Sequence, residues 1–173
     1  MTGNERRNQI LHLLREQGSP LSGTALAKTF GVSRQVIVQD IALIRAENHA
    51  IVSTNKGYIC RTEHNENTQP KRVFRVRHTN EQVLDELMTA LELGGRILDV
   101  AVEHELYGQI RADLVIENPQ DAQDFVQRLR QCRDNPLKVL TGDCHYHTIA
   151  APSEKLLDLI EDELRKKGYL LDL

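Results

Sequence analysis

Apolar positions in the first sixty residues recur at helical spacing and predict three helices. The first run covers residues 5–17 and meets Gly18, a residue that favours the left-handed conformation in which helices end. Ser22 can cap a second, shorter helix, which Gly31 closes, and Ser33 can cap a third. The third run carries one buried stripe, formed by Val36, Ile37, Ile41 and Ile44. Because only a tight turn separates the second run from the third, the pair predicts a helix-turn-helix.

Two short β-prone runs follow, residues 51–53 and 58–60, on either side of a turn that contains Lys56 and Gly57. A glycine-bearing turn between such runs is typical of a β-hairpin. Three helices followed by a hairpin is the order of a winged helix-turn-helix, a mainly α-helical domain. We therefore expect residues 1–60 to form this domain, with Lys56 at the tip of the wing.

The pattern changes after residue 71, where strand-like and helix-like runs follow one another in the order βαββαβα. The first strand ends in the segment FRVR at 74–77, and Thr79 with Gln82 resembles a capping box that opens the first helix. The remaining runs are two strands around a turn at Tyr107 and Gly108, a helix opened by Asn118 and Pro119, a strand within 136–148 and a last helix opened by Pro152. The order predicts that residues 72–173 form an α+β sandwich, with helices on one face of an antiparallel sheet.

The composition fits two small globular domains joined by a linker. Of the 173 residues, 40% are apolar and 27% are charged, which excludes an intrinsically disordered chain. Residues 61–71 are polar and include Pro70, so we interpret them as the linker. No apolar run is long enough for a membrane span, the first residues do not resemble a signal peptide, and the three cysteines have no repeated spacing. We therefore expect a cytoplasmic protein without disulfides.

Charge and the exposed side of the third helix point to DNA as a partner. Residues 1–60 hold seven Lys and Arg against four Asp and Glu, a net charge of +3, so this domain is the one suited to an anion. Polar side chains near the start of such a helix reach base edges in the major groove. The residues expected to contact double-stranded DNA are Ser33, Arg34, Gln35, Gln39 and Lys56. A three-helix interaction domain with a solvated polar face is the alternative interpretation.

Histidines carry the candidate chemistry of the second domain. If His145 and His147 lie in a strand, their imidazoles project from the same face, and His78 ends the first strand of the domain. Nitrogen and oxygen ligands of this kind suit zinc, nickel, cobalt or iron. Two solvated histidines on a surface strand remain the alternative, and helical spacing does not distinguish Asp85 from Glu86 as a further ligand. Three further histidines, His12, His49 and His64, are interpreted as surface residues.

Several segments resemble one family over most of the chain. The stretch from Leu26 to Cys60, which includes GVSRQVIVQDI, is similar to the biotin-repressor-like winged helix of bacterial NiaR-type, nicotinate-responsive repressors. The segments RVRH at 75–78, VEHELYG at 102–108 and PLKVLTGDCHYHTI at 136–149 resemble the three-histidine (3H) domain of the same family. One departure is Glu105, where the family tends to have proline after the histidine of the second segment.

The resemblance implies a fold, a metal site and an effector. The second domain would be an HPr-like sandwich that holds one divalent transition metal, nickel or zinc, and the family's metal ligands fall on His78, Glu86, His145 and His147. Nicotinic acid would be the corepressor of genes for NAD biosynthesis or niacin uptake. His104 and Tyr107 would contact this effector near the metal, although a structural role for His104 in a turn is equally compatible with the sequence.

We expect a regulator and not an enzyme, and we expect a homodimer. A single winged helix buries too little surface for tight specific binding, so two copies would read a pseudo-palindromic operator. A repressor that senses the metal itself uses the same residues and stays an alternative. A metal-dependent hydrolase fused to a DNA-binding domain is less well supported because the sequence contains no nucleophile and base pair and no glycine-rich phosphate loop. A histidine phosphocarrier stays a minor alternative, because it needs a histidine at the start of a helix and His78 directly precedes Thr79 and Asn80.

Overall fold

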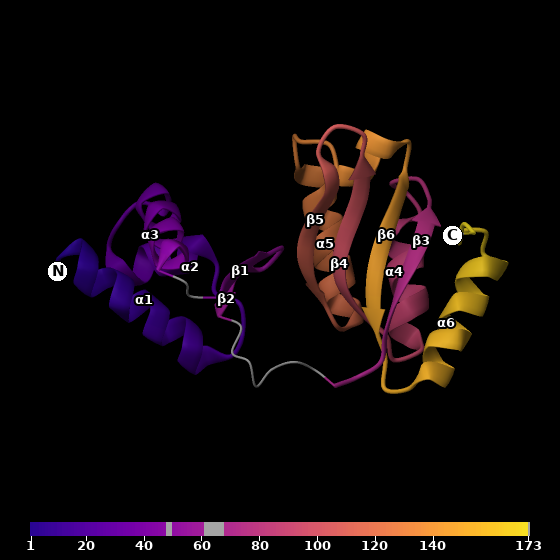
Figure 1. Ribbon diagram of the computed structural model, residues 1–173, viewed down its shortest axis with the longest axis horizontal. Coiled ribbons are helices and arrows are strands. Elements are labelled where there is room, and N and C mark those ends of the chain that lie inside the picture. Colours follow the sequence, from indigo (N-terminus) through magenta and orange to yellow (C-terminus); the bar gives the residue numbers. More distant parts are fainter. Residues whose placement is uncertain (48–49, 61–67, 173) are drawn as a thin grey trace. The chain divides into compact units, whose positions relative to one another are not determined.

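The computed structural model describes residues 1–47, 50–60 and 68–172, and the chain divides into a first unit, residues 1–67, and a second unit, residues 68–173 (Figure 1). Most of the predicted linker, residues 61–67, lies outside the described residues, as do His49 and His64. Of the described part of the predicted linker, residues 68–70 precede the first strand of the second unit, and Lys71 is already the first residue of that strand.

The first unit has the predicted order of three helices and a hairpin. Its elements are α1 (Gly3–Gln17), α2 (Gly23–Phe30), α3 (Arg34–Ala46), β1 (Ile51–Thr54) and β2 (Gly57–Cys60). The side chains of Ser22 and Ser33 accept the predicted hydrogen bonds at the starts of α2 and α3. Gly18 and Gly31 adopt the left-handed conformation just past α1 and α2. Local signals in the sequence therefore set the helix limits of this unit.

One buried residue of α3 was not predicted. Ile37, Ile41 and Ile44 are buried as expected and Val36 is half-buried, but the carboxylate of Asp40 is buried among them, with 3% of the residue exposed. The Nε of Arg6 in α1 donates to Asp40 Oδ2 at 2.6 Å, and Arg7 Nη1 lies 3.6 Å from Oδ1. Because a buried carboxylate needs such partners, this ion pair fixes α1 against α3.

Gly57 is required where the hairpin meets the segment before α2. Its φ is 138°, and a Cβ at this position would overlap the backbone carbonyl of Leu21. The backbones of Leu21 and Tyr58 exchange two hydrogen bonds of 2.8 Å here. The close approach therefore joins the wing to the helices.

Replacing Gly57 with Ala should destabilise the first unit by at least about 3 kcal/mol, because left-handed strain adds to the overlap with Leu21. Thermal unfolding of the full chain, followed by circular dichroism, measures the loss. Gly31→Ala is the matched control, since Gly31 has a φ of 63° but nothing within 4 Å of its added Cβ. It should cost only about 1 kcal/mol. Equal losses in the two variants would show that the approach to Leu21 is not a constraint.

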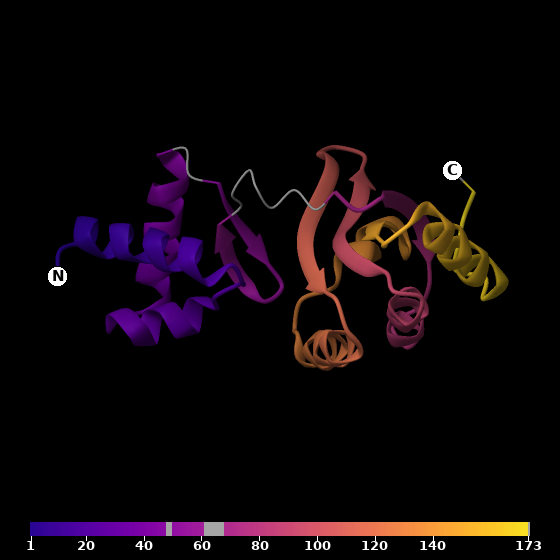
Figure 2. The same cartoon turned by 90° about the horizontal axis from the view of Figure 1, so that it is seen from below.

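The second unit has the predicted βαββαβα order. Its elements are β3 (Lys71–Arg77), α4 (Val83–Glu92), β4 (Arg96–His104), β5 (Gly108–Ile116), α5 (Pro119–Gln131), a 3₁₀ helix η2 (Leu137–Thr141), β6 (Cys144–Ala150) and α6 (Glu154–Lys166). The strands pair antiparallel in the order β5-β4-β6-β3. Figure 2 shows α4 and α5 side by side along one face of this sheet. Residues of α4, α5 and α6 share one apolar core with that face.

Strand register directs the histidines of β6 into this core. Phe74 and Val76 of β3 are buried in the core, and they lie opposite His147 and His145. Residues directly opposite one another in an antiparallel pair share a face of the sheet. His145 and His147 therefore point toward the helices, as does Ile149 two residues further along β6.

Two helix starts differ from the prediction. α4 begins at Val83 and not after Thr79, because only half of the expected capping box forms: Gln82 Oε1 accepts from the Thr79 backbone N–H at 2.9 Å. The Thr79 carbonyl instead accepts a hydrogen bond from the ring of His78. The last helix begins after Pro152, at Glu154, because the Ser153 side chain caps it. Residues 79–82 thus form a turn that carries His78 toward the core.

Candidate metal centre and DNA-binding face

Three imidazoles converge between the sheet and α4. His78 follows β3, and His145 and His147 lie on β6. The residues are 5%, 2% and 5% exposed, and one ring nitrogen of each lies within 4.8 Å of the others. The Nε2 atoms of His78 and His145 are 3.1 Å apart. These are the three histidines that the sequence singled out, and the fold brings them to one point.

Each of the three rings donates a hydrogen bond from Nδ1 to a backbone carbonyl. The acceptors are the carbonyl oxygens of Thr79 for His78, Asp143 for His145 and Asp99 for His147, at 2.9, 2.9 and 2.6 Å. Because a carbonyl can only accept, Nδ1 carries the proton and each Nε2 presents a lone pair. Lone pairs that face each other repel, so a cation is the natural partner. Metal-bound histidines in proteins are oriented in this way.

A buried carboxylate completes the cluster. Glu86 on α4 is 1% exposed, and its Oε2 lies 3.8 Å from the Nε2 atoms of His78 and His147. Neither carboxylate oxygen has a hydrogen-bond partner among the described residues. Such a group is costly to bury unless a cation balances it. Ligands about 2.0–2.1 Å from one zinc ion are themselves roughly 3–3.5 Å apart, so these four side chains fit a divalent transition metal.

Burial keeps the imidazoles of His78 and His145 neutral and able to bind a metal. Burial, together with charge repulsion from the nearby His147, lowers the pKa of His145 to about 2. Burial also lowers the pKa of His78, against the attraction of the Glu86 carboxylate. A proton on either ring would block the lone pair that the cluster presents. At neutral pH these rings are therefore free to act as ligands.

The metal-free chain should lose stability as the pH falls through the unfolded pKa of histidine. The folded pKa of His78 and His145 is lower than the ordinary value of 6.5, so above that pH neither state takes up a proton there. Below it the unfolded chain binds protons that the folded chain excludes, and stability falls by up to about 1.4 kcal/mol per pH unit for each histidine. Urea unfolding between pH 8 and pH 4 measures this slope. His145→Ala should reduce the slope and the surface variant His12→Ala should not, and an unchanged slope in His145→Ala would contradict the assignment.

Two residues that support the cluster were not predicted. Lys138 is 5% exposed, and its Nζ donates to the carbonyl of His78 at 2.9 Å and to Asp143 Oδ1 at 2.6 Å. Asp99, 2% exposed, lies at an irregularity in the pairing of β4. There its carboxylate accepts the Thr148 N–H at 2.8 Å, and its carbonyl meets His147. A charged residue inside the apolar strand run ILDVAVE was the available signal for Asp99.

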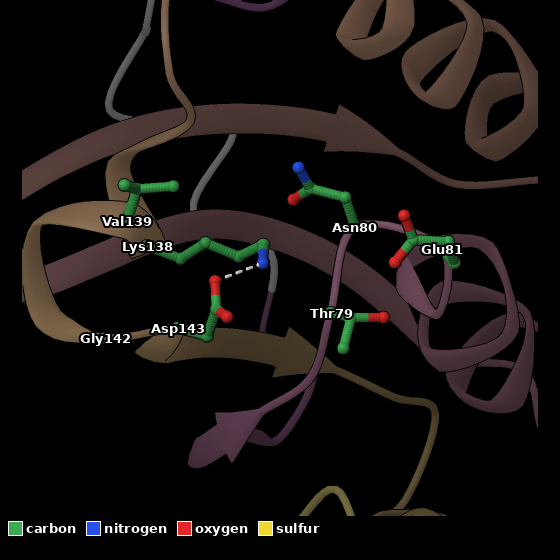
Figure 3. Close-up of a pocket in the computed structure, with 7 residues that line it drawn as sticks. All are labelled: Thr79, Asn80, Glu81, Lys138, Val139, Gly142 and Asp143. Carbon is green, nitrogen blue, oxygen red and sulfur yellow. Dashed lines mark hydrogen bonds and ion pairs between the residues drawn. The ribbon is translucent and has the colours of Figure 1, made fainter.

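A pocket of about 320 Å³ adjoins the cluster (Figure 3). Its lining comes from the turn after His78, from η2 and from the residues just before His145, and consists of Thr79, Asn80, Glu81, Lys138, Val139, Gly142 and Asp143. In Figure 3 the Lys138 ammonium and the Asp143 carboxylate meet at the pocket wall. The pocket is large enough for a small organic molecule.

The predicted effector residues lie in the turn between β4 and β5. The backbone N–H groups of Leu106 and Tyr107 donate to His104 Nδ1 at 3.2 and 3.3 Å, so this histidine holds the turn. The Tyr107 residue is 72% exposed, and its ring lies 4.9 Å from the His104 ring, centroid to centroid. Neither residue belongs to the metal-ligating cluster found among the described residues.

The predicted DNA-contacting residues lie at the start of α3 and in the wing. Arg34, Gln35 and Gln39 are exposed, and Ser33 is exposed while its hydroxyl caps the helix. Lys56 lies in the turn between β1 and β2. Nothing in the described part of the chain is a helix long and apolar enough for a membrane span.

Comparisons with known proteins match both units. An HTH domain model matches residues 6–59, and a 3H domain model matches residues 71–173. The "Probable transcription repressor NiaR" of Thermotoga maritima is 39% identical, over 97% of this chain and 94% of that protein. The "Transcription repressor NadR" of Bacillus subtilis is 34% identical, over 99% of this chain and 96% of that protein.

These relatives confirm the prediction of a DNA-binding transcription repressor and not an enzyme. The matched lengths span nearly the whole chain and therefore both units. The chain belongs to the family of transcription repressors that combine an N-terminal helix-turn-helix domain with a C-terminal 3H domain.

Proposed function

We propose that this repressor senses nicotinic acid through one divalent transition metal, nickel or zinc, and thereby controls genes of NAD biosynthesis or niacin uptake. The metal ligands would be His78, Glu86, His145 and His147. The observation that carries this proposal is that three Nε2 lone pairs converge on a buried carboxylate without a hydrogen-bond partner among the described residues. When bound, the metal would offer an open coordination position to the pyridine nitrogen or the carboxylate of the effector.

The protein's own residues would hold this centre rigid. Lys138 ties the carbonyl of His78 to Asp143, whose own carbonyl orients His145. The carbonyl of Asp99 likewise orients the ring of His147. Partners of this kind set the direction in which each ring presents its nitrogen, and their loss commonly lowers metal affinity tenfold to a hundredfold.

The pocket of Figure 3 is the effector site that we favour. Lys138 uses two of the three N–H donors of its ammonium group within the protein, which leaves one for a carboxylate. Asn80 adds an amide, and Val139 supplies an apolar wall for a ring. The predicted contact with His104 and Tyr107 is kept as a second candidate site, which would place the effector at the turn between β4 and β5.

A negative charge at the pocket wall should weaken effector binding without affecting the metal. Val139 is 45% exposed, so Val139→Glu should fold and lower the affinity for nicotinic acid more than tenfold, because two carboxylates would then face each other. Isothermal titration of the metal-loaded full chain, with nicotinamide as the comparison ligand, measures the loss. The neighbouring Leu140 is 56% exposed and does not line the pocket, so Leu140→Glu is the matched control. Retained affinity in Val139→Glu, with a loss in Tyr107→Ala, would place the effector at the turn instead.

For DNA, we propose that the first unit inserts α3 in the major groove. Ser33, Arg34, Gln35 and Gln39 would contact bases and phosphates, and Lys56 would reach the phosphate backbone or the minor groove from the wing. Two chains would bind a pseudo-palindromic operator as a homodimer in the cytoplasm. We also propose that the sandwich of the second unit is HPr-like, on the basis of its βαββαβα order.

A further inference from the structure

The centre of the solvent-facing side of α3 carries no charged residue. The exposed residues along its centre are Gln35, Gln39, Ala42, Leu43 and Ala46. At about 100° per residue they occupy an arc of roughly 100°, and Arg34 and Arg45 lie to one side of it. We call these five residues the uncharged strip. Figure 1 labels the helix that carries it.

An uncharged strip is unusual on a helix that faces water. Exposed helix faces in soluble domains normally carry charged residues, whereas Leu43 is 50% exposed here. No side-chain hydrogen bond within residues 1–47 and 50–60 engages the amides of Gln35 or Gln39. By contrast, Arg45 at the side of the strip is held by the Ile51 carbonyl at 2.8 Å and Ser53 Oγ at 2.7 Å. The strip thus offers two side-chain amides, those of Gln35 and Gln39, and the exposed apolar side chain of Leu43.

The chemistry of the strip suits base edges better than phosphates or another protein. Phosphates are held mainly by cations, which the strip lacks, although a glutamine amide can also donate to a phosphate oxygen. A stable protein interface buries about 800 Å² per partner around an apolar centre, which one leucine and two alanines cannot supply. In the major groove, however, a glutamine amide pairs with the N6 and N7 atoms of adenine, and an apolar side chain packs on the methyl group of thymine.

We propose that the uncharged strip makes the repressor select A·T base pairs at the centre of each half-site. Gln35 and Gln39 contact adenine edges, and Leu43 packs against a thymine methyl group. The inference rests on the proposed function, in which α3 enters the major groove. Arg34 and Lys56 lie outside the strip and contribute affinity through phosphates without selecting these pairs.

The preference for A·T pairs can be tested by letting the metal-loaded full chain select DNA from a pool of random duplexes in the presence of nicotinic acid. The wild type should select half-sites with a run of A·T pairs. Replacing each selected thymine in turn by deoxyuridine removes only the methyl group and should lower affinity about fourfold at the contacted position. Leu43→Ala should bind the thymine and uridine duplexes equally, because the alanine side chain is too short to reach the methyl group. The variant should keep α3 intact, since alanine has a high helix propensity.

The control is Val73→Ala, which truncates a side chain of similar exposure (49%) on β3 and should keep the full preference for thymine. Selection of G·C-centred half-sites, or equal binding of thymine and uridine duplexes by the wild type, would overturn the inference while leaving DNA binding by α3 intact. A wild type that selects no sequence would refute the proposed function itself. A Leu43→Ala variant that keeps the thymine preference but changes its oligomeric state would overturn the inference in favour of a contact between copies.

Discussion

The variant Glu86→Gln is expected to lose most of the thermal stabilisation that nickel or zinc gives to the wild type. Glu86 is the negatively charged member of the cluster, and a divalent cation among three neutral rings has little to balance it once this charge is gone. At a metal concentration about 1,000 times its dissociation constant, binding stabilises the folded state by about 4 kcal/mol. A hundredfold weaker affinity reduces this to about 1.4 kcal/mol.

The lost stabilisation corresponds to a large change in the midpoint temperature of unfolding. For a domain of about 100 residues, 1 kcal/mol corresponds to roughly 4–8 °C in the midpoint of unfolding. The metal-induced shift in Glu86→Gln should therefore be smaller than in the wild type by about 10–20 °C. Without metal the variant should be at least as stable as the wild type, because an amide costs less to bury than a carboxylate without a partner. Differential scanning calorimetry with and without the metal gives both values.

Asp85 provides the matched control for Glu86. It is the preceding residue of α4, but its carboxylate is paired outside the cluster with Lys167 Nζ at 2.9 Å and the Tyr169 hydroxyl at 2.7 Å. Asp85→Asn should keep the full metal-induced shift. A Glu86→Gln protein that also keeps it would show that this carboxylate is not a ligand.

His145→Ala is expected to abolish the response of DNA binding to nicotinic acid and to leave basal DNA binding within about threefold of the wild type. The reason is the division of the chain, since His145 lies in the second unit and the proposed DNA contacts lie in the first. Removing His145 leaves only three of the four proposed ligands, so the metal should bind much more weakly and the response that depends on it should be lost. Fluorescence anisotropy on promoter DNA at fixed salt measures both quantities.

The control for this variant is His12→Ala, a change at an exposed histidine of α1 that should keep the full response. A His145→Ala chain that no longer folds would indicate a metal with a purely structural role. A folded His145→Ala chain that still responds to nicotinic acid would contradict a metal-dependent sensor.

Local signals account for the parts of the fold that the sequence predicted. The serines at the starts of α2 and α3 and the glycines after α1 and α2 act within a few residues, so periodicity and caps located these helices. Alternation along β6 likewise predicted that His145 and His147 share a face. The predicted start of α4, after Thr79, was wrong because the Thr79 carbonyl accepts a hydrogen bond from the His78 ring and does not begin the helix.

The residues that escaped prediction depend on partners far away in the chain. Asp40 is buried because Arg6 reaches it from α1, and Lys138 is buried because it bridges His78 and Asp143. No periodicity within α3 or η2 reports such contacts. Spacing also left Asp85 and Glu86 equivalent, and only the packing of α4 on the sheet turns one carboxylate outward and the other toward the histidines.

The most direct test of the central claim is an anisotropy titration of the metal-loaded chain on its own upstream promoter DNA, with and without nicotinic acid, at fixed salt. A sensor coupled to the DNA site by about 1–3 kcal/mol predicts binding that is about 5–150 times tighter with nicotinic acid, and no change with nicotinamide. An affinity for DNA that does not change with nicotinic acid, but changes when the metal is added or removed, would contradict the account and identify a metal-sensing repressor.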